Sequence, residues 1–108
     1  MILRCSGLIS RRKITISGSK SISNRLLILQ SLFPNITIKN LSTSDDTRHM
    51  LYALKSSSNK INIGHAGTAM RFLTSFFSVK KNSIVEIYGS KRMHKRPIAV
   101  LAVSYTHL

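Results

Sequence analysis

The chain has 108 residues, and 43% of them are hydrophobic, which is enough for one small domain with a modest core. Its 17 lysines and arginines stand against three acidic residues, so the formal net charge is +14 at pH 7. This balance favours anionic partners: nucleic acid, acidic membranes, or phosphorylated and carboxylated metabolites.

The cysteine content and the apolar runs exclude several classes of protein. Cys5 is the only cysteine, which excludes an internal disulfide and fits a reducing compartment. No Cys/His spacing is typical of zinc, and no apolar run resembles a signal peptide or reaches transmembrane length. We therefore expect a cytoplasmic protein with no metal and no membrane segment.

The first regular elements predicted are a strand and a helix. Residues Lys13–Ile16 alternate and are β-rich, which favours a strand. A helix is expected over about Ile22–Phe33, where apolar residues recur with helical spacing, and Pro34 ends it. A glycine-containing turn joins the two elements.

This turn has the composition of an anion-binding site. Gly18 permits a tight turn, and the hydroxyl of Ser19 or Ser21 can cap the helix by accepting a backbone N–H. The other free N–H groups and the positive end of the helix dipole favour an anion near Lys20 and Arg25. A well-capped helix with two solvated basic residues is an equally consistent interpretation.

The middle of the chain predicts a second set of elements. We expect a strand at Ile36–Lys39, a turn and helix cap at Ser42–Asp46, and a helix over about Asp46–Lys55. After a polar loop, Lys60–Ile63 is predicted to form a short strand.

The stretch Gly64–Arg71 repeats the first arrangement, because a strand again runs through a glycine turn into a helix. Backbone N–H groups near Gly67 and Thr68 can meet an anion there. The alternative is a turn of small residues that only lets helix and strand pack closely.

The last predicted elements are a strand at Ile84–Tyr88, a basic loop at Gly89–Pro97, and a helix that begins at Pro97. The predicted order is β-β-α-β-α-β-α-β-α with short connections. This order indicates an α/β or α+β domain in which helices lie against a sheet.

Four motifs together resemble the amino-terminal quarter of the 5-enolpyruvylshikimate-3-phosphate synthases. They occur in the same order at similar spacing, and the resemblance covers about Leu3–Leu101. The UDP-N-acetylglucosamine enolpyruvyl transferases are less similar, because their first motif has Lys-Asn where this chain has Lys20-Ser21. The motifs are Gly18–Arg25, Ser44–Met50, Ala66–Arg71, and Arg92-Met93 with Arg96-Pro97-Ile98.

The resemblance implies a fold and an activity. The fold is part of an inside-out α/β barrel built from βαβαββ repeats. The activity transfers the enolpyruvyl group of phosphoenolpyruvate to the 5-hydroxyl of shikimate-3-phosphate and releases phosphate, a step toward chorismate and the aromatic amino acids. The resemblance also implies no cofactor, no nucleic-acid or membrane partner, and an intact enzyme that is a monomer.

The resemblance further assigns binding residues. Lys20, Ser21 and Arg25 match positions that hold shikimate-3-phosphate, and Lys20, Gly67 and Arg92 match positions that hold phosphoenolpyruvate. The family's acid and base residues lie in a later portion, so no catalytic residue is expected here and the 108 residues alone are expected to be inactive.

Other positions are expected to act indirectly or to depart from the family. We interpret Asp45 and Asp46 as structural, and we expect Arg71, Lys91 and Arg96 to contribute positive charge without contact.

Two departures stand in the turns themselves. His65 replaces the family's usual Asn and is interpreted as a polar residue satisfied within its turn. Ser17 replaces the usual Pro, which is expected to loosen the turn.

The resemblance also divides the chain. Residues 1–16 are expected to pair with an absent second domain, and residues 17–101 to form a partial enolpyruvyl transferase domain. Residues 102–108 no longer follow the resemblance and are interpreted as a tail of doubtful origin.

Two other function classes stay open. A small basic nucleic-acid-binding module has weak support, because the basic residues are scattered and Trp is absent. A merely structural α/β domain from a basic proteome is the third hypothesis. Only the synthase hypothesis requires Lys20, Arg25, Gly67 and Arg92 to converge on one concave site.

Overall fold

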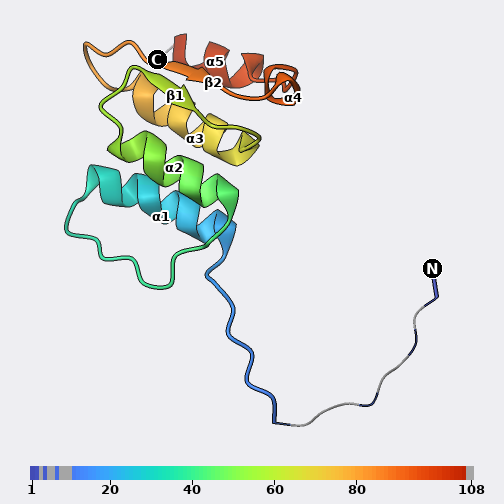
Figure 1. The fold of residues 1–108 in the computed structure, drawn as a ribbon. Helices are drawn as coiled ribbons and strands as arrows, with labels where there is room; N and C mark the ends of the chain where they lie inside the picture. The colour runs from blue at the N-terminus through green and yellow to red at the C-terminus, as the bar shows by residue number, and fades with distance from the viewer. Residues whose placement is uncertain (3, 5–6, 8–10, 107–108) are drawn as a thin grey trace.

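The computed structural model describes residues 1–2, 4, 7 and 11–106, with side chains described as far as residue 102. Three helices stack on one another, and a small sheet and a last helix continue the stack (Figure 1). The elements are α1 (Lys20–Leu32), α2 (Asp45–Lys55), β1 (Lys60–Asn62), α3 (Gly67–Ser78), β2 (Glu86–Tyr88), α4 (Lys91–His94) and α5 (Ala99–Thr106).

The sheet consists of β1 and β2, which run parallel and are connected through α3. Ile61 pairs with Ile87 in the ladder, and the Ile63 N–H donates to the Tyr88 carbonyl at 2.9 Å. The mixed α/β class is therefore confirmed. The described residues contribute two strands to this sheet and form no barrel, so the barrel remains an expectation drawn from the resemblance.

The hydrophobic core lies between the helices and the sheet. Met50 of α2, Ile61 of β1 and Leu73 of α3 are at most 1% exposed. They come from the apolar faces that helical and strand periodicity predicts. The remaining buried members are Leu27, Ala53, Ile63, Ala66, Ala69, Met70 and Met93.

The helix predictions are confirmed with small shifts at the ends. The first helix begins at Lys20 rather than at Ile22, and the second begins at Asp45 behind an Ser44 cap that accepts from the Thr47 N–H. Ser19 occupies the N-cap position of α1, but its side chain makes no cap hydrogen bond, so the predicted serine cap of this helix is wrong.

Two predicted strands are not strands. Residues Lys13–Ile16 have no ladder partner among the described residues, and Ile14 and Ile16 are 82% and 77% exposed. Figure 1 shows this segment leaving the body of the molecule. Alternation alone does not make a strand, because a ladder needs a second strand beside it.

The segment Ile36–Lys39 keeps the burial alternation of a strand but pairs with no strand in the described structure. Ile38 packs against the core, and the Gln30 side-chain amide donates to the Ile36 carbonyl at 2.7 Å. The alternation that predicted a strand therefore reflects packing of a loop beside α1, because a ladder needs a second strand.

The two ends of the chain bear on other expectations. The predicted final helix is confirmed as α5, which begins two residues after Pro97 and extends into the tail as far as Thr106. Cys5 and His107 lie outside the described residues. Within the described part of the chain, no helix has the length and apolar character needed to cross a membrane.

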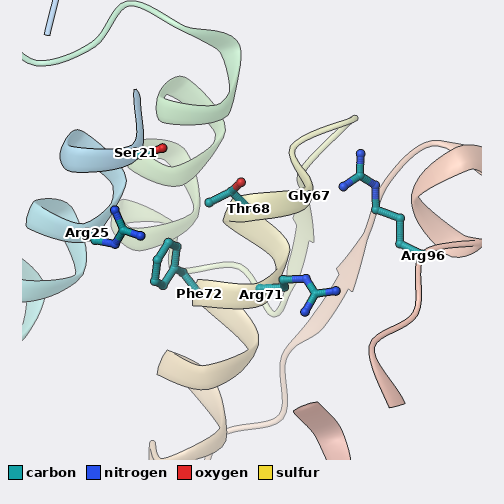
Figure 2. A pocket seen from close by; sticks show the side chains of 7 residues that line it. All are labelled: Ser21, Arg25, Gly67, Thr68, Arg71, Phe72 and Arg96. Atoms are coloured by element: carbon teal, nitrogen blue, oxygen red, sulfur yellow. The ribbon is translucent and has the colours of Figure 1, made fainter. Parts of the chain in front are cut away.

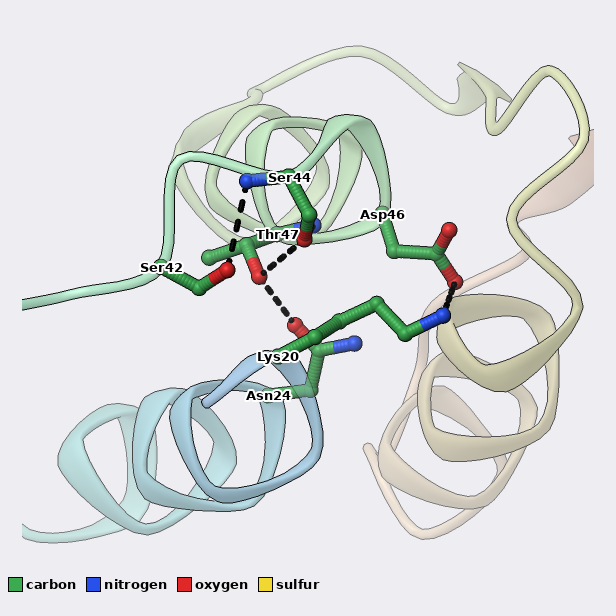
Figure 3. A network of polar contacts seen from close by, with 6 residues as sticks. All are labelled: Lys20, Asn24, Ser42, Ser44, Asp46 and Thr47. Carbon is green, nitrogen blue, oxygen red and sulfur yellow. Dashed lines mark hydrogen bonds and ion pairs between the residues drawn. The ribbon is translucent and has the colours of Figure 1, made fainter. Parts of the chain in front are cut away.

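A buried polar network joins α1 to α2 (Figure 3). The Thr47 hydroxyl donates to Asn24 Oδ1 at 2.9 Å, and the Ser42 N–H donates to the Ser23 hydroxyl at 2.9 Å. Asn24 and Thr47 are fully buried, and Asn24 Nδ2 has no hydrogen-bond partner within the described structure. The network fixes the first turn of α1, which carries Lys20 and Ser21, against α2.

We predict that Thr47→Val lowers the free energy of unfolding by about 1–3 kcal/mol, because the buried Asn24 amide then loses its remaining partner. Urea unfolding measures the change. Adding Asn24→Leu to Thr47→Val is expected to cost less than the sum of the single changes, since no polar group is then left unpaired.

The matched control is Thr37→Val, an exposed threonine in the loop after α1, which is expected to change stability by less than about 0.5 kcal/mol. Simple additivity of Asn24→Leu and Thr47→Val would contradict the energetic coupling.

Candidate anion-binding site

The first turns of α1 and α3 face each other across a basic hollow of about 190 Å³ (Figure 2). Ser21 and Arg25 come from α1, and Gly67 comes from the start of α3. These are three of the five residues predicted to bind substrate. The hollow is completed by Thr68, Arg71, Phe72 and Arg96.

The arginines of this hollow are held in different ways. The Arg25 guanidinium lies 6.0 Å from the centre of the Phe72 ring, a cation–π arrangement that lets it face the hollow. Arg71 Nη2 donates to the Pro97 carbonyl at 3.0 Å, which ties α3 to the segment before α5. Because these contacts hold two of the three guanidiniums, the basic wall is partly preorganised.

Gly67 has a structural role that involves Arg96. A Cβ atom added at Gly67 would lie 2.8 Å from Arg96 Cζ and closer still to Nη1. The guanidinium therefore occupies space that only glycine leaves open (Figure 2). The Gly67 N–H already donates to the His65 carbonyl at 2.9 Å, so this amide is engaged within its turn rather than free for an anion.

Arg92 lines a neighbouring hollow instead of the first one. This second hollow is lined by His65, Ser90, Arg92, Met93 and Arg96, and its volume is about 220 Å³. Arg96 lines both hollows, so the two basic surfaces are continuous through its side chain. The predicted phosphoenolpyruvate residues Gly67 and Arg92 therefore line two different hollows rather than one concave site.

Lys20 lines neither hollow. Its ammonium lies 3.8 Å from an Asp46 carboxylate oxygen, and the lysine side chain is 46% exposed (Figure 3). Because the lysine is this exposed and the two atoms are 3.8 Å apart, the ion pair is worth at most about 1 kcal/mol. The sequence analysis interprets Asp46 as a structural residue. In the structure, Asp46 also forms the ion pair that turns Lys20 toward α2.

The acidic side chains lie away from both hollows. Asp46 faces Lys20, Asp45 lies 3.7 Å from Arg48, and Glu86 lies 3.2 Å from Lys60. With no carboxylate among the residues that line them, the hollows carry uncompensated positive charge. Within the described part of the chain, no three His, Cys, Asp or Glu side chains come together as a metal site would require.

Sequence reasoning missed part of the first hollow. Arg71 and Arg96 line it directly, although they were expected to act without contact, and Thr68 and Phe72 were given no binding role. Helical spacing could have indicated three of these residues, because residues 68, 71 and 72 fall on the same face of the helix as residue 67. The approach of Arg96 has no such signal, since it depends on the path of the loop after β2.

Comparison with known proteins identifies the family. The family model described as EPSP synthase (3-phosphoshikimate 1-carboxyvinyltransferase) matches residues 10–61 and 55–106, nearly the whole chain. This chain belongs to the EPSP synthase family. The match reaches residue 106, so it includes residues 102–106, which the resemblance seen in the sequence does not cover.

Several curated relatives of this EPSP synthase family member carry the name that describes the family model. It is 44% identical to a 3-phosphoshikimate 1-carboxyvinyltransferase of Buchnera aphidicola subsp. Cinara cedri, with 80% of this chain and 26% of the relative covered. The protein of that name from Bacteroides fragilis is 46% identical, with 82% and 22% covered. A pentafunctional AROM polypeptide of Lodderomyces elongisporus is 40% identical, with 86% and 8% covered.

The chain therefore spans about a quarter of the length of the bacterial relatives. No solved structure matches it.

A series of glycine substitutions separates binding from folding. Gly67→Ala is expected to displace the Arg96 guanidinium and weaken binding of a phosphate-class anion, while leaving the unfolding midpoint unchanged or slightly raised, because alanine favours helix. Anion titration and urea unfolding of the same samples measure the two effects.

Two further glycines serve as controls. A Cβ at Gly18 would collide with the Asn40 carbonyl oxygen, so Gly18→Ala is expected to cost more than about 1 kcal/mol of stability. Gly7 has nothing within 4 Å, so Gly7→Ala is expected to change neither property. Unaltered anion binding by Gly67→Ala would contradict the role given to Arg96.

Proposed function

We propose that this chain supplies one half of the substrate site of a 3-phosphoshikimate 1-carboxyvinyltransferase. The observation that carries the proposal is the meeting of Ser21 and Arg25 from α1 with Gly67 from α3 in one basic hollow, in a chain of the EPSP synthase family. The reaction joins the enolpyruvyl group of phosphoenolpyruvate to shikimate-3-phosphate and releases phosphate.

The chemistry explains why such a site needs concentrated positive charge. The 5-hydroxyl of shikimate-3-phosphate gives up its proton and forms a bond to C2 of phosphoenolpyruvate while C3 takes a proton. The tetrahedral adduct then loses phosphate from C2 and a proton from C3, which restores the double bond. Two phosphates and two carboxylates must be held close together throughout. Their mutual repulsion has to be offset by fixed cations, which also stabilise charge that develops in the transition state.

The first hollow is the proposed shikimate-3-phosphate site. Arg25 would form a planar, two-point contact with the phosphate, and the Ser21 hydroxyl would donate a further hydrogen bond. Lys20 would turn from Asp46 toward the substrates, and the weakness of their ion pair makes this rotation inexpensive.

The second hollow is the proposed phosphoenolpyruvate side. Arg92 would grip the anion there, and Gly67 would keep the boundary between the hollows open. Arg96, which lines both, would face the two substrates at once. The acid and base groups of the reaction are proposed to lie in the portion of the enzyme beyond these 108 residues, so the chain alone would bind substrate without turnover.

We expect Arg25→Ala to weaken binding of shikimate-3-phosphate by roughly tenfold or more, because a charged hydrogen-bonding group is lost from the hollow. Isothermal titration calorimetry of the 108-residue chain measures the affinity. Lys20→Ala tests in the same way whether Lys20 reaches the substrate.

The matched control is Arg48→Ala, which removes the same charge from an exposed position on α2 where Arg48 faces Asp45. The affinity of the Arg48→Ala variant for shikimate-3-phosphate is expected to stay within about twofold of that of the unaltered chain. Equal losses for Arg25→Ala and Arg48→Ala would mean that the substrate responds to net charge alone, as the nucleic-acid-module hypothesis also predicts, and the site assignment would fail.

A further inference from the structure

The second hollow is built by two glycine turns that meet at the same end of the sheet. His65 follows Gly64 after β1, and Ser90 follows Gly89 after β2. The Ser90 N–H donates to the Gly64 carbonyl at 2.9 Å, and a Cβ at Gly89 would lie 2.5 Å from that oxygen. Because β1 and β2 are parallel and in register, this contact places the His65 turn beside α4.

The side chains of the second hollow form a set suited to an oxyanion. Arg92 and Arg96 contribute guanidiniums, Ser90 a hydroxyl and His65 an imidazole, and Met93, only 4% exposed, anchors α4 in the core. Guanidiniums donate hydrogen bonds in a planar fork that matches phosphate-like groups. Three of these groups are permanent donors or fixed charges, whereas the imidazole gains its second N–H only when it takes up a proton.

We propose that His65 makes anion binding in the second hollow pH-dependent, because an imidazolium there strengthens the binding of a dianionic oxyanion. The proposal rests on the proposed function and deepens it, because it gives the phosphoenolpyruvate side of the site a pH dependence. Histidine is the side chain that ordinarily changes charge between about pH 5 and 8. Anion binding and proton uptake must favour each other by thermodynamic linkage.

The charged groups around His65 determine the sign of the effect. Arg92 of α4 and Arg96 of the loop before α5 line the hollow together with His65. On the α2 side, the His49 ring lies against Gly64, where a Cβ would be 2.9 Å from Nε2. None of these groups is acidic, so a bound dianion supplies the negative charge that an imidazolium at His65 would contact. Affinity should therefore rise as pH falls.

Sulfate is the probe that isolates this effect, because it stays dianionic across the whole range whereas phosphate takes up a proton of its own. The 108-residue chain is titrated with sulfate at constant ionic strength, at about pH 5.5 and about pH 8. Amide and imidazole NMR signals of the hollow report saturation. We expect the affinity to be on the order of fivefold higher at the lower pH, the size of one added contact at a partly exposed site.

Three variants assign the effect. His65→Asn is expected to lose most of the gain in sulfate affinity between about pH 8 and about pH 5.5. His94→Asn serves as the matched control, because His94 lies on α4 but lines a different hollow, and it should keep the full gain. Arg92→Ala should weaken sulfate binding at both pH values.

A gain at low pH that survives in His65→Asn would overturn the proposal, and so would the absence of saturable sulfate binding at either pH. The outcome is separable from the proposed function, which is tested with shikimate-3-phosphate and Arg25. A chain that fails to bind shikimate-3-phosphate but shows His65-dependent sulfate binding would refute only the substrate assignment.

Discussion

The guanidinium of Arg96 lies against the bare Cα of Gly67, and this close approach joins two basic hollows into one surface. The contact is possible because glycine leaves room at the first residue of α3. It requires the loop after β2 to return to the start of α3, which the parallel β1–α3–β2 unit provides. The core beneath holds both elements in place through residues such as Leu73 and Met93.

Carboxylates pair with some of the basic residues of the chain but not with those that line the two hollows. The three carboxylates lie beside Lys20, Arg48 and Lys60, each away from the hollows. Arg25, Arg71, Arg92 and Arg96 are thus left to line concave surfaces without an acidic partner among the lining residues. A phosphorylated, carboxylated substrate would supply the missing negative charge, which is the physical reason for proposing that such a substrate binds there.

Local signals in the sequence predict much of this arrangement. Helical periodicity locates α1, α2 and α3 within a few residues, and the glycine turns locate the helix starts that face the first hollow. The predicted strand at Ile36–Lys39 is wrong because alternating apolar and polar residues indicate only that one side of the segment is buried. A loop packed against the core shows the same alternation. The predicted strand at Lys13–Ile16 is wrong because a strand needs a neighbouring strand, and the local sequence does not show whether one is present.

The binding residues divide in the same way. The resemblance assigns Ser21, Arg25 and Gly67 to the substrate site, and the first hollow brings these three residues together. No periodic pattern in the sequence predicts where Arg96 lies, since its position depends on the path of the loop between α4 and α5. Lys20 was assigned by resemblance, and its orientation toward Asp46 depends on how α1 packs against α2. Long-range packing therefore decides which of the many basic residues become part of the site.

The central claim is that the starts of α1 and α3 act together on one anion. The most direct measurement is an amide chemical-shift map of the 108-residue chain during titration with shikimate-3-phosphate. We expect the amide signals of Ser21, Arg25 and Thr68 to shift together along one saturating curve, while those of β1 do not move. Shifts spread over the basic surface that grow without saturation would contradict it.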